Sequence, residues 1–228
     1  MRRKAVTAYK TILATPPWPD RVGRNKAPQF HYPRIPVAEI MALRVEDLCD
    51  PMGAHLYLCT PNSWLSVAMD VVRAWNFRYV SIITWAKMTA RAADLFCPES
   101  RGFGQYFRSN TEHVLFAVRG KLPYRLDITR DPPRRMQGST LITAPRFRYP
   151  YKPPELIEMC ERVSFPPRLE MWAPRERDGW DVWGPAVDDG GVTIKSMLYE
   201  DENGNEAPLA PLEDAPEPTP GRRKDSWE

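Results

Sequence analysis

The 228-residue chain lacks long hydrophobic runs, and this absence limits where the protein can work. No stretch approaches the ~18 consecutive apolar residues that a membrane-spanning helix requires. Residues 1–4 are mostly basic, but the apolar core of a secretion signal does not follow them. The sequence therefore predicts a soluble, cytoplasmic protein with no membrane partner.

Closely spaced metal ligands are also missing. The four cysteines are widely separated, at Cys49, Cys59, Cys97 and Cys160. This spacing does not fit a zinc knuckle, and disulfides do not persist in a reducing compartment. The three histidines are equally scattered. We therefore expect buried free thiols and no metal centre.

Charge is unevenly distributed along the chain, although the formal net charge is only +3. Residues 188–228 contain 11 acidic and 4 basic side chains, so this segment carries −7. Residues 1–187 contain 28 basic and 18 acidic side chains, and carry +10. A basic body is typical of a protein with a polyanionic partner. We expect residues 1–187 to form one folded domain and the acidic, proline-rich residues 188–228 to be a disordered tail.

Apolar runs rich in β-forming residues alternate with stretches of helical periodicity. The expected strands are 7–14, 54–60, 77–85, 113–118, 141–142 and 168–172, and the expected helices begin at Pro36, at Asn62 or Ser63 as the cap, and at Pro154. Asn76 is expected to end the second helix, and residues 121–137 form a basic, proline-broken loop. This alternation predicts an α/β fold, with a mainly parallel sheet and helices on both faces.

The first expected strand ends in an unusual turn, Thr15-Pro16-Pro17-Trp18. Prolines fix the turn and offer carbonyl acceptors without an N–H donor. The carboxyl ends of strands in an α/β sheet are where ligands bind, and the indole can stack on a flat ring. The amino group of a nucleobase is a poor nucleophile, so acceptors for its hydrogens would assist its attack on a methyl donor. The turn thus favours amino-group methylation of a base extruded from its duplex.

Further motifs follow this turn in a defined order. They are His31-Tyr32-Pro33, Trp85 with Lys87, Gly102 with Gly104, Tyr106 and Arg108, Glu112-His113, Lys152-Pro153, Arg168 to Ala173, and Gly179, Trp180, Trp183 and Gly184. In order and spacing, the chain from about Tyr9 to Gly184 resembles the MT-A70 family of N6-adenine methyltransferases. That family includes mRNA-modifying enzymes and bacterial and phage DNA enzymes.

The resemblance implies a Rossmann-like fold of permuted motif order, S-adenosylmethionine as cofactor, and nucleic acid, DNA rather than RNA, as partner. It also implies that a homodimer or heterodimer can form. The site residues it implies are Thr15, Pro16, Pro17 and Trp18 for catalysis; Lys152, Pro153, Glu170, Trp172 and Arg175 for the cofactor; and His31, Tyr32, Tyr106 and Arg108 for the substrate. In the family, the residue matched by Lys152 binds the methionine carboxylate of the cofactor.

The chain departs from the family pattern at three places, which leaves two alternatives open. Thr15 replaces the aspartate of Asp-Pro-Pro-Trp, and an uncharged hydroxyl is a weaker acceptor than a carboxylate. Pro150 and Pro174 replace a polar residue and an arginine beside the cofactor motifs, and Pro185-Ala186 replaces two polar residues. Thr15 resembles the Ser-Pro-Pro-aromatic motif of cytosine amino-methyltransferases. The alternatives to adenine methylation are therefore cytosine amino methylation and an inactive nucleic-acid-binding subunit.

Overall fold

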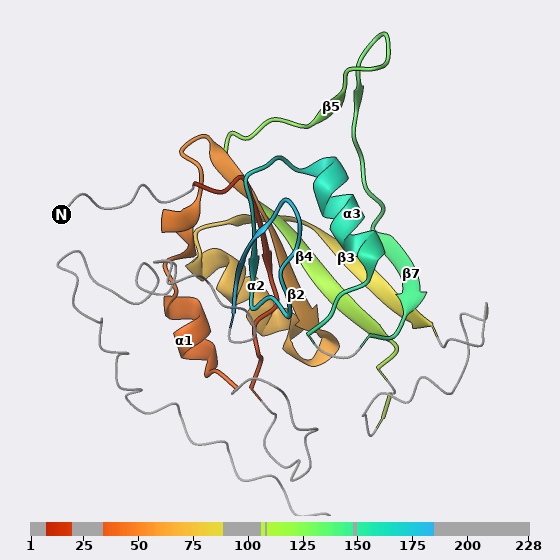
Figure 1. The fold of residues 1–228 in the computed structure, drawn as a ribbon. Coiled ribbons are helices and arrows are strands. Elements are labelled where there is room, and N and C mark those ends of the chain that lie inside the picture. The colour runs from red at the N-terminus through yellow and green to blue at the C-terminus, as the bar shows by residue number, and fades with distance from the viewer. Residues whose placement is uncertain (1–7, 20–33, 89–105, 108, 148–149, 185–228) are drawn as a thin grey trace, which may run out of the picture.

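A single large sheet forms the centre of the protein in the computed structural model, which describes residues 8–19, 34–88, 106–107, 109–147 and 150–184. Its strands are β1 (Thr11–Ala14), β2 (Gly53–Pro61), β3 (Arg78–Met88), β4 (Thr111–Gly120), β7 (Leu141–Pro145), β8 (Arg168–Met171) and β9 (Asp181–Trp183). These seven strands lie in the order β7-β3-β4-β2-β1-β8-β9 (Figure 1). β1 and β8 are therefore neighbours, although they are far apart in the sequence.

The sheet is mixed rather than purely parallel. β4 runs antiparallel to both of its neighbours, β2 and β3, whereas the remaining neighbouring pairs run parallel. The expectation of a mainly parallel sheet is therefore only partly right. The apolar pattern of residues 113–118 identified a strand here, but such a pattern carries no information on strand direction.

Helices cover both faces of the sheet, as expected from the sequence. α1 (Val37–Ala42) and α2 (Leu65–Ala74) pack on one face, and α3 (Pro154–Val163) packs on the other (Figure 1). Because successive strand residues point to opposite faces, Ile12 and Ala14 join the core beneath α1 and α2, while Leu13 joins the core beneath α3. Two buried cores thus hold the sheet from both sides.

The ends of the second helix differ in how well the sequence predicted them. A short 3-10 helix, η2 (Asn62–Trp64), precedes α2, and Trp64 is the N-cap residue without a side-chain cap hydrogen bond. The expected cap by Asn62 or Ser63 is therefore wrong, because the Asn62 amide instead donates to the hydroxyls of Ser109 and Thr111. Asn76 does end the helical segment, with a left-handed φ of 61°, a conformation that asparagine tolerates.

Three short strands and a second 3-10 helix, η1 (Val45–Leu48), were not foreseen. Besides β9, they are β5 (Leu126–Asp127) and β6 (Arg134–Arg135), which pair within residues 121–137, where a loop was expected. This two-stranded arm extends away from the body (Figure 1). Its base is tied to α3, since the Arg125 guanidinium donates to the carbonyl oxygens of Glu161 and Ser164. Strands of two residues fall below the length that sequence patterns detect.

The carboxyl ends of β1, β2, β3 and β8 lie at one edge of the sheet, because these strands share one direction. Residues Thr15, Pro61, Met88 and Trp172 mark this edge, which we call the Thr15 edge. β4 begins there, since it runs the opposite way.

Within the described part of the chain, none of the helices is sufficiently long and apolar to cross a bilayer.

Candidate active site

The Thr15-Pro16-Pro17-Trp18 turn lies directly beyond β1, as predicted. The backbone N–H of Thr15 donates to the Met171 carbonyl of β8 at 3.3 Å, and the Trp18 N–H donates to the Pro16 carbonyl at 2.9 Å. The turn is therefore fixed by β8 and by its own backbone.

Trp18 is a buried part of this edge. Its indole N–H donates to the Cys59 carbonyl at 3.0 Å, and its ring stacks on Trp64 with centroids 6.1 Å apart and planes 15° apart. Trp64 therefore occupies one face of the indole. The role of Trp18 in stacking a flipped base stays a prediction, and it concerns the opposite face of the ring.

Thr15 points to the face of the sheet that carries α3. Its side chain is buried, with 3% of the residue exposed, and it lies near the Cys59 thiol, whose pKa it acts to lower. Burial raises the pKa of that thiol to about 11, and the Thr15 hydroxyl and the charge of Lys152 lower it only in part. Cys59 therefore remains a neutral thiol at physiological pH, and it lies within electrostatic reach of both Thr15 and Lys152.

An ion cluster lies on the same face at the Thr15 edge. The Glu112 carboxylate accepts from Lys87 Nζ through Oε2 at 2.9 Å, and from Lys152 Nζ through Oε1. The side chain of Lys152 is 2% exposed, and those of Lys87 and Glu112 are 15% exposed. Strand register places Glu112 between Pro61 of β2 and Trp85 of β3. The cluster therefore joins the end of β3 and the start of β4 to Lys152, two residues before α3.

Glu112 and Lys152 keep their charges within this cluster. Burial alone would raise the pKa of Glu112, but the ammonium groups of Lys152 and Lys87 lower it to about 2. Burial alone would lower the pKa of Lys152, but the Glu112 carboxylate raises it above its ordinary value. Counted with the formal charge of Lys87, the cluster holds two positive charges and one negative charge, which suits binding of a further anion.

A second ion pair lies at the end of β8. Glu170 is 2% exposed, and its carboxylate accepts from Arg177 Nε at 2.9 Å. In the parallel register Glu170 lies beside Leu13 of β1, so it faces α3 together with Thr15. One carboxylate oxygen pairs with arginine, and the other is an acceptor of the kind that binds a sugar hydroxyl.

The backbone after Glu170 has an uncommon conformation. Trp172 has a φ of 58°, which is rare for a bulky residue, and such conformations concentrate at functional sites. Its ring packs against Trp183 with centroids 5.2 Å apart. Gly184, the residue after β9, lies very close to the backbone that follows β8. A Cβ added at Gly184 would lie 2.9 Å from the backbone of Trp172 and Ala173. The ends of β8 and β9 thus approach each other directly.

Several residues predicted for the site are not brought together by the described structure. His31, Tyr32 and Arg108 lie outside the described residues. Tyr106 is 93% exposed, Arg175 is exposed, and Pro153 is buried as the N-cap residue of α3. The roles predicted for all of these residues stay predictions.

Three contributors to the site were not singled out from the sequence. Lys87 and Glu112 belong to matched motifs, yet no role was assigned to them, and Arg177 rather than Arg175 pairs with Glu170. The signal available for the first two was their position at the ends of two expected strands. The pairing of Lys87 with Glu112 depends on the antiparallel register of β3 and β4, which the sequence pattern did not reveal.

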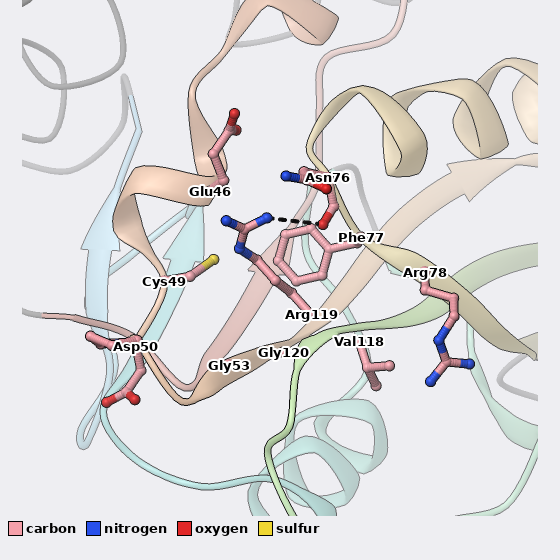
Figure 2. A pocket seen from close by; sticks show the side chains of 11 residues that line it. Glu46, Cys49, Asp50, Gly53, Asn76, Phe77, Arg78, Val118, Arg119 and Gly120 are labelled. Carbon is pink, nitrogen blue, oxygen red and sulfur yellow. Dashed lines mark hydrogen bonds between the residues drawn. The ribbon is translucent and has the colours of Figure 1, made fainter.

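A cavity of about 470 Å³ lies at the other end of β2, away from the Thr15 edge. Figure 2 shows Arg119 directed between Cys49 and Asn76, and its guanidinium donates to the Asn76 carbonyl at 3.2 Å. Burial raises the pKa of Cys49 to about 12, although Arg119 acts to lower it. Gly53 and Gly120 meet here as register partners. This cavity therefore does not contain the turn or the ion cluster.

In the part of the chain that the structure describes, no group of three or more histidine, cysteine, aspartate or glutamate side chains is arranged to hold a metal ion. Cys49, Cys59 and Cys160 are free thiols, and the last two are buried. Cys97 lies outside the described residues.

Comparison with known proteins agrees with this geometry. Residues 9–186 match the MT-A70 family, a span that contains the turn, the ion cluster and the Glu170–Arg177 pair. A curated relative is a type II methyltransferase, M.MunI, of Mycoplasma sp. It is 24% identical over 218 residues, covering 86% of this chain and 84% of the relative. The chain therefore belongs to the MT-A70 family of S-adenosylmethionine-dependent methyltransferases.

Proposed function

We propose that this protein transfers a methyl group from S-adenosylmethionine to the N6 amino group of adenine in DNA. The observation that carries the proposal is the meeting of two functional elements on one face of the sheet. The Cys59 thiol lies near Thr15 of the proline turn and within reach of the charge of Lys152. The residue that we propose to hold the amino nitrogen and the residue that we propose to hold the cofactor therefore lie at the same edge.

The residues at the Thr15 edge fit the cofactor chemically. The buried ammonium of Lys152, in a cluster with a formal charge of +1, suits a carboxylate. The second carboxylate oxygen of Glu170 suits a ribose hydroxyl, and the left-handed Trp172 turns the chain where β8 ends. Pro174 stands where the family has an arginine, and its side chain cannot donate a hydrogen bond to the cofactor. Affinity for the nucleoside part of the cofactor therefore depends on Glu170 and its neighbours.

The proposed reaction uses the turn to activate the amino nitrogen. Bound S-adenosylmethionine supplies a methyl carbon made electrophilic by its positive sulfur. The Pro16 carbonyl and the Thr15 hydroxyl accept hydrogen bonds from the amino hydrogens, which frees the nitrogen lone pair from the ring. A nitrogen–carbon bond forms as the carbon–sulfur bond breaks. The nitrogen then releases one proton to solvent, and S-adenosylhomocysteine leaves.

DNA is the favoured polymer for two reasons. Residues 1–187 carry a formal charge of +10, and positive surfaces provide the phosphate contacts of nucleic-acid binding. The resemblance also extends to bacterial and phage DNA enzymes of the family. In a duplex, the target base must leave the stack to reach a turn as buried as this one.

Cytosine amino methylation is the second candidate, and Thr15 is the observation that favours it. A hydroxyl at this position resembles the Ser-Pro-Pro-aromatic motif of cytosine enzymes. The same acceptors would bind the amino group of either base, because both amino groups present two hydrogens. Only the methylated product separates the two reactions.

The test is a nucleoside digest. Purified protein is incubated with methyl-labelled S-adenosylmethionine and unmethylated duplex DNA, and in parallel with RNA, and the digested nucleosides are identified by mass spectrometry. Lys152→Met is compared with Lys10→Met, which removes the same charge at the opposite end of β1. We expect labelled N6-methyladenine from DNA with the unaltered protein and Lys10→Met, and a strong loss with Lys152→Met.

Three results would contradict the proposal. N4-methylcytosine in place of methyladenine would establish the second candidate. Labelled nucleoside from RNA alone would show that RNA, and not DNA, is the substrate. An absence of labelled nucleoside from both polymers, with folded protein, would favour an inactive nucleic-acid-binding subunit.

A further inference from the structure

The ion cluster of Lys87, Glu112 and Lys152 contains more charged groups than the proposed reaction requires. If the only requirement were a cation for the cofactor carboxylate, Lys152 alone would satisfy it. Instead, a carboxylate contacts Lys152 directly, and that carboxylate is shared with a second lysine at 2.9 Å. Burying three charges is costly unless each is well paired, so the arrangement needs a reason.

Geometry restricts Glu112 far more than it restricts an ordinary surface glutamate. Its backbone is held in the sheet by pairing with Pro61 of β2 and with Trp85 of β3. Its two carboxylate oxygens are each bound by a different lysine. A lysine side chain has a flexible four-carbon stem, so its ammonium group reaches many positions when nothing restrains it. The Lys152 ammonium is therefore held by a group that is itself held by two strands.

Lys87 balances the charge of this support. Its ammonium contacts Glu112, and it lies 4.8 Å from the centre of the Trp85 ring, where a cation is stabilised by the ring face. With Lys87 the cluster has a formal charge of +1. Without it, Glu112 and Lys152 would neutralise each other, and the attraction for an anionic ligand would be lost.

We propose that Glu112 is a positioning residue for the cofactor, which orients the Lys152 ammonium toward the carboxylate of S-adenosylmethionine, while Lys87 keeps the cluster cationic. This inference rests on the proposed function. It differs from a purely electrostatic account in the sign of one effect. Glu112→Gln raises the cluster charge from +1 to +2, so charge alone would tighten binding of a carboxylate, whereas loss of positioning weakens it.

The experiment uses two probes, of which only one carries the carboxylate that the cluster is proposed to bind. S-adenosylhomocysteine carries the amino-acid carboxylate, and 5′-methylthioadenosine lacks it. Calorimetric dissociation constants for both are measured with the full chain, with Glu112→Gln and with Lys87→Met. Asp70→Asn, in an exposed ion pair of α2, and Lys10→Met serve as charge-matched controls. Thermal melting shows that each variant is folded.

We expect Glu112→Gln to weaken binding of S-adenosylhomocysteine about tenfold or more, the range of a hydrogen bond to a charged group. Binding of 5′-methylthioadenosine should change less than about twofold, since it does not reach Lys152. Lys87→Met should weaken the first probe only, and Lys87→Arg should restore it. Both control variants should leave both constants unchanged.

Two outcomes would overturn the inference. Unchanged or tighter binding of S-adenosylhomocysteine by Glu112→Gln would show that charge alone governs the site. Equal losses for both probes would show that Glu112 only supports the fold. If Glu112→Gln does not fold, Glu112→Asp gives the same comparison, because it keeps the charge but shortens the side chain: positioning predicts weaker binding of S-adenosylhomocysteine, and charge alone predicts unchanged binding. If the unaltered protein binds neither probe, the proposed function fails instead, and the inference fails with it.

Discussion

Replacement of Thr15 tests whether its hydroxyl assists the reaction. Thr15→Val keeps the shape of the side chain but removes the acceptor, and Thr15 lies at the end of β1 with 3% of its surface exposed. A neutral hydrogen bond contributes about 0.5–1.5 kcal/mol, and each ~1.4 kcal/mol is a factor of ten in rate. If the bond forms fully only in the transition state, kcat should fall about two- to tenfold with little change in KM for DNA.

Thr15→Asp should act in the opposite direction. A charged acceptor adds about 1 kcal/mol or more to such a bond, so kcat for adenine should rise about fivefold. The new carboxyl group would be buried near Glu112 and Glu170, both of which act on the neighbouring thiol of Cys59. Burial and like charge raise the pKa of a carboxyl group, so the gain should increase with pH as that group ionises.

The assay is the initial rate of methyl transfer to duplex DNA at saturating S-adenosylmethionine. The rate is measured from about pH 6 to about pH 9, a range that spans ionisation of a carboxyl group with a raised pKa. Thr11→Val is the matched control. Thr11 is buried at the other end of β1, and its hydroxyl donates to the Phe165 carbonyl at 2.7 Å. This control removes a hydroxyl from the same strand, and kcat should not change. An unchanged kcat in both Thr15 variants would refute an acceptor role for this side chain.

The remaining predictions concern stability, measured by urea or thermal unfolding. Burial lowers the pKa of His55 to about 4, against about 6.5 when unfolded. Protonation as pH falls through this window therefore favours the unfolded chain, and the free energy of unfolding should drop by about 2 kcal/mol from pH 7 to pH 5. The reasoning fails if His55→Gln shows the same drop. Arg177→Gln leaves Glu170 buried without its partner and should cost about 2 kcal/mol, whereas Arg175→Gln should cost less than about 0.5 kcal/mol; equal costs would contradict the pairing. Gly184→Ala places a Cβ 2.9 Å from backbone and should destabilise by about 1–3 kcal/mol, so an unchanged melting temperature would argue against this close approach.

The elements predicted best from the sequence are those with strong local signals. Continuous apolar runs located β1 and β2, and Asn76 ended its helical segment because its short polar side chain tolerates a left-handed backbone. The direction of β4 was not predictable, because an apolar run is the same read in either sense. β9 comprises only Asp181–Trp183, which is too short for a periodic pattern.

The candidate site was predictable in composition but not in pairing. The proline turn and Lys152 were identified from motifs, and the structure places both beside Cys59. The partner of Lys152 was not identified, because Glu112 and Lys152 are brought together by the sheet order, in which β4 and β7 both lie beside β3. Trp18 was assigned to base stacking, yet it also stacks on Trp64, a residue distant in sequence. Local patterns specify strand ends, whereas contacts between those ends arise from the sheet order.

The central claim is that the turn at Thr15 and the ammonium of Lys152 serve one bound cofactor. A crystal structure of the complex with S-adenosylhomocysteine tests it most directly. The account predicts that the ligand carboxylate contacts Lys152 Nζ, that its ribose lies beside Glu170, and that its sulfur faces the Pro16 carbonyl. A ligand bound elsewhere, for instance in the cavity around Arg119, or bound without contact to Lys152, would contradict it.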